Sequence, residues 1–199
     1  MNSFTRCQLV ISGVGGQGVL FVTGLLAQAA MDQGFHVMTS ETHGMAQRGG
    51  TVISHLKVGD FSSPLIRTGN ADALIALKQE NLNSHAHFLK PDGLAIVNSA
   101  ESSACSPTQT CHAIDADGLA ARTGHLRSVN LIVLGFTLAI LSYKIPDSPS
   151  FCAIDAVRSI ISQKMNRNPS GSQTALLALN AGYDQGLAAS TLHPSQFSQ

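Results

Sequence analysis

The fold is decided by the stretch Leu9-Val10-Ile11-Ser12-Gly13-Val14-Gly15-Gly16-Gln17-Gly18-Val19-Leu20. A run of β-prone apolar residues leads into Gly-x-Gly-x-x-Gly, and apolar residues at helical spacing continue to Gly34. The pattern predicts a strand, a glycine turn and a helix over 19–33. Glycines allow a tight turn and close approach to the backbone, and the free N–H groups at a helix start favour an anion. By itself the spacing fits equally well a glycine turn that only packs a strand against a helix.

A second glycine-rich segment follows at a short distance along the chain. Residues 36–39 predict a second parallel strand, which would complete a βαβ unit and put Glu41 where dinucleotide-binding proteins carry their ribose-binding acid. The segment Ser40–Gly50 comes next and is polar and rich in glycine, and residues 51–59 then alternate like a strand. Because the carboxyl ends of neighbouring parallel strands meet at one edge of a sheet, we expect the two glycine-rich segments to face each other there.

From Pro64 onward the sequence alternates between helix and strand patterns. The predicted strands are 73–77, 94–98 and 112–115, and the predicted helices are 81–89, 117–123, 129–141, 150–165 and 173–188. The Pro91-Asp92-Gly93 sequence predicts a turn. The alternation predicts an α/β, Rossmann-like fold: a mainly parallel sheet with helices on both faces and further helices at the C-terminal end. We expect one domain over 1–189 and a disordered tail over 190–199.

Composition narrows the classes of partner. The formal net charge is +0 at pH 7 and 12% of residues are charged, so no nucleic-acid or membrane binding is expected. So few charges leave apolar surface that a partner subunit, or a second copy of an isolated chain, can cover. The apolar run 131–141 is too short to cross a bilayer and is expected in the core. No secretory pattern opens the sequence, which favours a cytoplasmic location.

The cysteines and histidines predict no metal site. Cys7, Cys105, Cys111 and Cys152 are scattered, without the Cys-x-x-Cys spacing of zinc or iron–sulfur sites, and are expected as reduced thiols. The pair in His85-Ala86-His87 has no third ligand nearby in the sequence.

Taken together, the two glycine-rich segments resemble a known family. The residues Gly-Val-Gly-Gly-Gln-Gly-Val at 13–19 and Glu-Thr-His-Gly-Met-Ala-Gln-Arg-Gly-Gly-Thr at 41–51 are similar to the gamma-type domain of the 2-oxoacid:ferredoxin oxidoreductases. The sequence at 43–50 is most similar to that of the beta subunits of the indolepyruvate branch. The pyruvate and 2-oxoglutarate branches, which usually carry Gly-Pro-Glu-x-Arg-Gly-Gly there, remain the alternative. The resemblance extends weakly through 63–66, the helix around Asn130, and Ala-Gly-Tyr at 181–183.

The resemblance implies a subunit of an enzyme complex that oxidatively decarboxylates aryl 2-oxoacids such as indolepyruvate. The acyl group goes to coenzyme A and the electrons go to ferredoxin. This chain has neither the Gly-Asp-Gly segment of a thiamine diphosphate and Mg²⁺ site nor a cysteine-rich cluster motif, so a larger partner subunit is expected to carry these cofactors. The chain is expected to be inactive alone and to complete the active-site cleft, with ferredoxin as an indirect partner.

The same resemblance suggests which residues hold an anionic group of coenzyme A or of the 2-oxoacid. The expected set is Gly13, Gly15, Gly16, Gln17, Gly18, Glu41, His43, Gln47, Arg48 and Gly49. The Arg48 guanidinium can grip a phosphate or a carboxylate through two hydrogen bonds, or can pair with Glu41 and only shape the loop. Gln17 either touches the ligand or caps the helix. His43 has no companion base and is expected to order its loop.

Two other classes of function stay open from the sequence. One is an independent NAD(P)-binding Rossmann protein with Glu41 on the ribose, although no further βα crossover follows Glu41 and no Tyr-x-x-x-Lys pair is present. The other is a non-enzymatic scaffold whose glycine turn only packs and whose helix 129–141 contacts a partner. Titration with NADH tests the first, and co-purification with a partner separates both from the oxidoreductase subunit.

Overall fold

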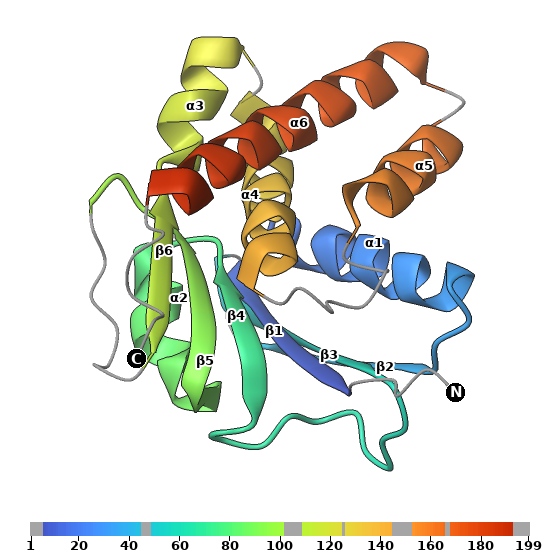
Figure 1. Ribbon diagram of the computed structural model, residues 1–199, viewed down its shortest axis with the longest axis vertical. Coiled ribbons are helices and arrows are strands. Elements are labelled where there is room, and N and C mark those ends of the chain that lie inside the picture. Colours follow the sequence, from blue (N-terminus) through green and yellow to red (C-terminus); the bar gives the residue numbers. More distant parts are fainter. Residues whose placement is uncertain are drawn as a thin grey trace.

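The structure, a computed structural model, describes residues 6–44, 49–101, 109–124, 126–144, 153–165 and 168–192. Its centre is a six-stranded sheet with helices on both faces (Figure 1). The strands are β1 (Cys7–Val14), β2 (Val37–His43), β3 (Thr51–Val58), β4 (Ala71–Ala76), β5 (Leu89–Asn98) and β6 (Thr110–Ile114). The helices are α1 (Val19–Asp32), α2 (Gln79–His85), α3 (Ala116–Thr123), α4 (Val129–Lys144), α5 (Ile154–Lys164) and α6 (Pro169–Leu192), with short 3₁₀ turns η1 (Ala86–Phe88) and η2 (Leu126–Ser128).

The sheet order is β2-β3-β1-β4-β5-β6. Neighbours from β1 to β6 are parallel, whereas β3 is antiparallel to both β1 and β2. The predicted mainly parallel, Rossmann-like α/β class is confirmed. The prediction that the first two strands are neighbours is wrong, because β3 turns back after β2 and inserts between them.

Two apolar layers hold helices against the sheet. The larger core lies between the sheet and α1, α4, α5 and α6, and it includes Leu9, Ile11 and Leu56. The smaller core lies under α2 and η1 on the other face, around Val10, Leu74 and Leu82. Figure 1 shows α2 behind the sheet and the longer helices in front of it. Burial on both faces explains why β3 is not half exposed, despite its alternating sequence.

Helix α1 begins and ends near the predicted residues. Its end at Gly34 is confirmed, because the Gly34 N–H donates to Met31 O (2.9 Å) and the Phe35 N–H donates to Ala30 O (3.0 Å). Of the residues whose apolar spacing predicts an inward face, Leu20 is exposed and the others are buried: Val19, Val22, Thr23, Leu26 and Ala30. Leu25 and Ala29 are buried as well. The buried face of α1 is wider than contact with the sheet alone would require, because α5 packs against α1 as well.

Helix α4 is the central helix of the larger layer. One stretch, Leu126–Tyr143, has the length and composition of a membrane span, yet 67% of it is buried inside the fold. The predicted core position of the run 131–141 is confirmed, with Ile132, Val133 and Leu134 fully buried.

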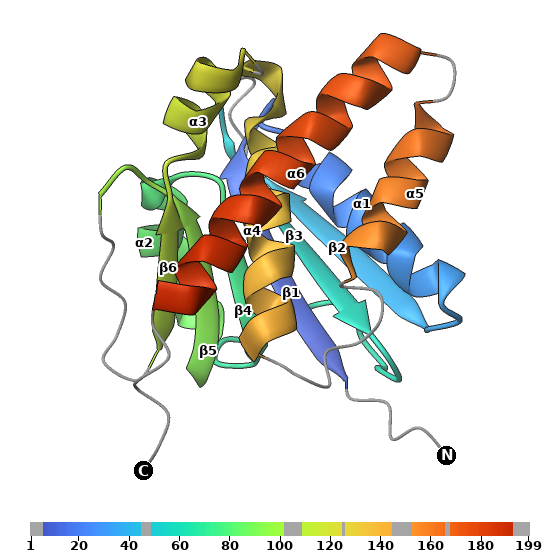
Figure 2. The same cartoon turned by 45° about the horizontal axis from the view of Figure 1, so that its top comes forward.

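Helices α4 and α6 cross each other in the helical layer (Figure 2). A Cβ built on Gly182 would lie 1.9 Å from Ile132 O, and one built on Gly135 would lie 2.0 Å from Leu179 O. Both distances are far inside van der Waals contact with backbone atoms, so only glycine fits at these two positions. The Ala-Gly-Tyr segment at 181–183 therefore has a packing role at the crossing.

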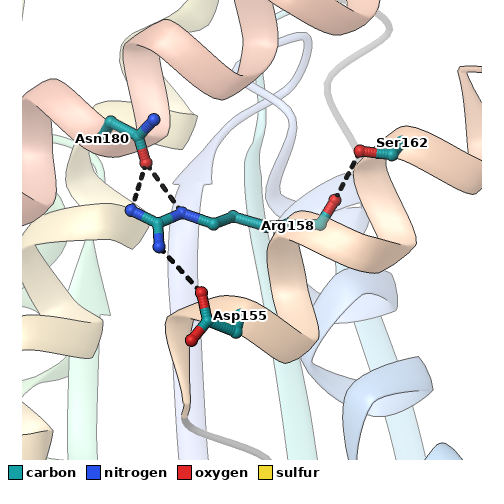
Figure 3. Close-up of polar contacts among 4 residues, drawn as sticks. All are labelled: Asp155, Arg158, Ser162 and Asn180. Atoms are coloured by element: carbon teal, nitrogen blue, oxygen red, sulfur yellow. Dashed lines mark hydrogen bonds and ion pairs between the residues drawn. The ribbon is translucent and has the colours of Figure 1, made fainter.

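A hydrogen-bonded guanidinium ties α5 to α6 (Figure 3). Arg158 donates from Nε (2.9 Å) and from Nη2 (2.7 Å) to Asn180 Oδ1, and from Nη1 to Asp155 Oδ1 (2.8 Å). One side chain thus fixes the angle between the two C-terminal helices.

Several predicted boundaries shift in the structure. Strand β5 begins at Leu89, and Pro91-Asp92-Gly93 forms an irregularity within it, since Ala71 pairs with Leu89 and Ala73 with Leu94. Helix α6 continues to Leu192 with Ser190 buried, so the first part of the expected tail 190–199 is helical. The remainder of that tail lies outside the described residues. So do 150–152, where the fourth of the predicted helices was expected to begin.

The α4–α6 crossing makes a direct prediction about stability. Gly182→Ala must push the two helices apart and is expected to lower the free energy of unfolding by about 1–3 kcal/mol or more. Gly24→Ala is the matched control, because Gly24 lies within α1 and a Cβ there meets nothing within 4 Å. The control should gain about 0.5–1 kcal/mol from helix propensity. Urea unfolding of both variants measures the difference, and equal stabilities would contradict the described crossing.

Candidate functional site

The glycine turn joins the carboxyl end of β1 to the start of α1. The Gln17 N–H donates to Val14 O (3.0 Å), which closes a tight turn over residues 14–17. Gly16 has a φ of 94° and Gly18 a φ of 82°, values in the left-handed region that residues with a side chain rarely adopt. The predicted strand, glycine turn and helix are confirmed.

The second glycine-rich segment contacts this turn directly. The Gly15 N–H donates to Gly50 O (2.9 Å), and the Gly44 N–H donates to Thr51 O (2.8 Å) where the chain returns into β3. A Cβ on Gly15 would lie 3.6 Å from Gly50 O, an ordinary contact, so Gly15 acts through its amide rather than through a strained backbone. The expected meeting of the two segments at one edge of the sheet is confirmed, although β3 and not a neighbouring parallel strand delivers the second one.

Two residues of the turn serve its shape. Gln17 Oε1 accepts a hydrogen bond from the Val14 N–H (2.7 Å), so the Gln17 side chain folds back over the turn. A Cβ on Gly13 would lie 2.8 Å from Val19 Cγ2 and 3.1 Å from Leu77 Cδ1. Gly13 is therefore the residue that allows β1 and α1 to approach each other closely.

Other amides of the turn remain available for a ligand. Among the described residues, the Gly16 and Gly18 N–H groups have no hydrogen-bond acceptor. They stand beside the first turn of α1, whose own N–H groups have no intrahelical partner and whose dipole favours negative charge. The arrangement can hold one oxyanion against backbone donors.

Asn130 also belongs to this site. From the sequence alone it lies only within a helix to which the family resemblance extends, and it is not among the predicted site residues. It lies in the first turn of α4, and a Cβ on Gly18 would come within 2.3 Å of Asn130 Nδ2. Its Oδ1 accepts from the Leu131 N–H (3.0 Å), which leaves Nδ2 directed toward the glycine turn. A lone amide at the start of an otherwise apolar helix was the signal in the sequence.

The remaining predicted residues fall into two groups. Gln47, Arg48 and the side chain of His43 lie outside the described residues, so their roles stay predictions. Glu41 is exposed on β2 and pairs with Ser54 of β3, in the row of Ile11. Because β3 intervenes, Glu41 and β1 are about 10 Å apart by strand spacing. Gly49 (φ 77°) lies exposed at the return of the loop.

A buried polar cluster lies next to the turn on the opposite face of the sheet. His85 Nδ1 of α2 is 2.9 Å from Ser12 Oγ and 3.0 Å from Asn81 O, and the His55 ring packs edge-on against Phe88. Burial lowers the pKa of His85; the hydrogen bond to Asn81 O opposes this effect and the nearby His87 adds to it. Burial, followed by the charges of Lys57 and His85, lowers the pKa of His55. Both imidazoles are therefore neutral in the folded protein near pH 7.

Within the described ranges, no group of three or more His, Cys, Asp or Glu residues could hold a metal ion. Cys7 is buried and Cys111 is half-buried. Cys105 and Cys152 lie outside the described residues.

The fold and the site define a Rossmann-like α/β domain whose glycine turn is joined by a hairpin loop at the carboxyl edge of the sheet. A family model described as pyruvate ferredoxin/flavodoxin oxidoreductase matches residues 8–185. The chain is 32% identical to an indolepyruvate oxidoreductase subunit IorB of Archaeoglobus fulgidus, over 92% of this chain and 96% of that protein.

Solved structures share the fold. The gamma subunit of a keto/oxoacid ferredoxin oxidoreductase from Geobacter sulfurreducens superposes with a TM-score of 0.72 at 23% identity, covering 92% of this chain and 99% of that one. A 2-oxoglutarate:ferredoxin oxidoreductase chain from Magnetococcus marinus superposes with a TM-score of 0.75 at 17% identity, covering 98% of this chain and 32% of that one. The chain belongs to the pyruvate ferredoxin/flavodoxin oxidoreductase family, and it is a subunit of a 2-oxoacid:ferredoxin oxidoreductase.

Gly18→Ala is expected to damage the site by two effects. The left-handed backbone costs about 1–2 kcal/mol for alanine, and the new methyl group collides with Asn130. Gly69→Ala is the matched control, with a φ of 74° and open space around its Cβ. We expect Gly18→Ala to lower the unfolding free energy more than Gly69→Ala does. Combining Gly18→Ala with Asn130→Ala should remove the excess, and an excess that survives in the double variant would refute the contact.

The buried histidines predict a pH dependence of stability. Their pKa values are lowered in the folded state, so below pH 6.5 the unfolded chain binds more protons than the folded chain. The free energy of unfolding should be fully retained above pH 6.5 and should fall as the pH drops below that value. His85→Asn, which keeps a polar atom near Ser12, should make the loss between pH 7.5 and 5.5 smaller in urea unfolding. An unchanged pH dependence would exclude His85 as a source.

Proposed function

We propose that this chain is the smaller subunit of an indolepyruvate-type ferredoxin oxidoreductase, where it completes the active-site cleft around an anionic group of coenzyme A or of the 2-oxoacid. The whole-length similarity to an indolepyruvate oxidoreductase subunit favours aryl 2-oxoacids. The sequence of residues 43–50 supports the same indolepyruvate branch of the family.

One observation carries the proposal: the Gly15 N–H to Gly50 O hydrogen bond. It holds Gly50, two residues after Arg48 in the sequence, against the glycine turn, next to the available amides of Gly16 and Gly18. Backbone donors, a helix start and a guanidinium from the adjoining loop are the groups that recognise a phosphate or a carboxylate. These groups can bind an anion, but they cannot carry out decarboxylation or electron transfer.

We assign thiamine diphosphate, Mg²⁺ and the iron–sulfur clusters to a larger partner subunit, with ferredoxin as its electron acceptor. The sequence lacks a Gly-Asp-Gly segment and cysteine-rich motifs, which supports this division of labour. The four cysteines are scattered without a paired spacing, which fits the reducing cytoplasm that we propose as its location.

The sheet order counts against the NAD(P) alternative. In a dinucleotide-binding Rossmann domain the second strand lies beside the first, and its terminal acid reaches the ribose. Here antiparallel β3 occupies that place, and Glu41 is carried one strand farther away. The described residues therefore give the dinucleotide reading no support beyond the glycine spacing.

Reconstitution with the larger subunit tests the proposed function. The isolated chain should be colourless and inactive, and the complex should couple oxidation of indolepyruvate to coenzyme A-dependent reduction of ferredoxin. Arg48→Ala should raise the apparent KM for one anionic substrate by about 10- to 100-fold, the effect expected for losing charged hydrogen bonds. Arg48→Lys keeps the charge but loses the two parallel hydrogen bonds of the guanidinium, so its apparent KM should lie between those of the wild type and Arg48→Ala.

The matched control is Arg67→Ala, an exposed arginine on the loop between β3 and β4 at the opposite edge of the sheet. It should leave both KM values unchanged. Iron–sulfur absorbance in the chain purified alone, or a complex that reduces NAD⁺ in preference to ferredoxin, would contradict the proposed function. Unchanged kinetics in Arg48→Ala would remove Arg48 from the site.

A further inference from the structure

A cavity of about 520 Å³ opens beside the glycine turn, on the side of α1 and the C-terminal helices. Its walls come from the starts of α1 and α4 and from the junction of α5 with α6, and they include Phe21, Asn130, Met165 and Asn168. Asn130 belongs to both the cavity and the turn, since its Nδ2 lies against Gly18. The cavity is therefore continuous with the candidate site. Arg158 braces its far wall by holding α5 to α6 (Figure 3).

Large apolar side chains are exposed on Phe21, which lines this cavity, and on direct sequence neighbours of its lining residues. Phe21 is 39% exposed and lines it, the adjacent Leu20 is 43% exposed, and Leu126, beside the lining residue Arg127, is 70% exposed. These three residues lie where α1 and α4 begin, at the carboxyl edge of the sheet. Clustered exposed leucine and phenylalanine around a hollow are typical of a protein interface.

Two polar side chains line the cavity just before α4. Ser128 is 9% exposed, and no hydrogen bond joins its hydroxyl to a described residue. Arg127 is exposed and forms no ion pair with any described residue. A hydroxyl and a guanidinium in this position can both donate hydrogen bonds to a carboxylate.

A protein explains these features better than a small molecule does. A ligand confined to the cavity would leave Leu20 and Leu126 in water, whereas a protein surface would cover them together with Phe21. The Magnetococcus chain that shares this fold has about two thirds of its length outside the matched part, so there the same fold is joined to a much larger body of protein.

We propose that the cavity and its rim of Leu20, Phe21 and Leu126 form the docking surface for the larger subunit, with a carboxylate of that subunit bound by Arg127 and Ser128. This inference rests on the proposed function, which supplies the partner. It places the glycine turn at the inner boundary of the interface, so the available amides of Gly16 and Gly18 face a site that is closed by both subunits.

The test compares exposed residues at opposite ends of α1 and at opposite ends of the continuous segment formed by η2 and α4. Phe21→Asp and Leu126→Asp alter the proposed surface, whereas Met31→Asp at the far end of α1 and Tyr143→Asp at the far end of α4 are matched controls, each 49% exposed. Association with the larger subunit is measured by calorimetry on folded chains whose melting temperatures match the wild type. We expect Kd to rise at least about 30-fold for the first pair and less than about 2-fold for the controls.

Arg127 supplies a second measurement. Arg127→Gln should raise Kd about 10-fold and weaken its dependence on salt, since a charge pair across the interface is screened by ions. If the wild-type chain associates and all variants associate equally well, the surface is wrong while the proposed function stands. If the wild-type chain does not associate at all, the proposed function fails first. Stabilisation of the isolated wild-type chain, but not of Arg127→Gln, by inorganic pyrophosphate would overturn a protein occupant.

Discussion

A backbone hydrogen bond between described residues, from the Gly15 N–H to Gly50 O, joins the two segments on which the site depends. It exists because β3 turns back after β2 and pairs with β1 over its whole length, from Cys7 opposite Val58 to Val14 opposite Thr51. The end of β1 and the start of β3 thus lie side by side, and Gly50, just before β3, lies against the glycine turn. A parallel neighbour, as in a dinucleotide-binding domain, would leave this edge open.

The glycine crossing of α4 and α6 sets the other side of the site. Gly135 and Gly182 let the two backbones touch, so α4 can sit between the sheet and α6 without displacing either. The position of α4 in turn carries Asn130 to Gly18 and places Arg127 and Ser128 at the cavity. A shift of α4 would change its packing against α6 and would also move Asn130 relative to the glycine turn. The packing of the helical layer and the geometry of the site therefore depend on each other.

Local chemistry explains what the sequence predicted well. The strand, glycine turn and helix over 9–33 follow from an apolar run, Gly16 and Gly18, and a helix end at Gly34, all settled within a few residues. Elements that depend on distant partners were predicted less well. The antiparallel insertion of β3 is decided by pairing with β1 some forty residues away, and the exposure of Leu20 depends on which helices cover α1. Asn130 could be placed beside Gly18 only once the packing of α4 was known.

We propose that this subunit meets its partner and the substrate at the carboxyl edge of the sheet, from the glycine turn to the return of the second loop. Hydrogen–deuterium exchange of the chain with and without the larger subunit tests this proposal most directly. We expect slower exchange in peptides covering 13–21 and 41–51, with little change at 59–70 on the opposite edge of the sheet. Protection confined to 59–70, with the glycine turn exchanging as fast in the complex as alone, would contradict it.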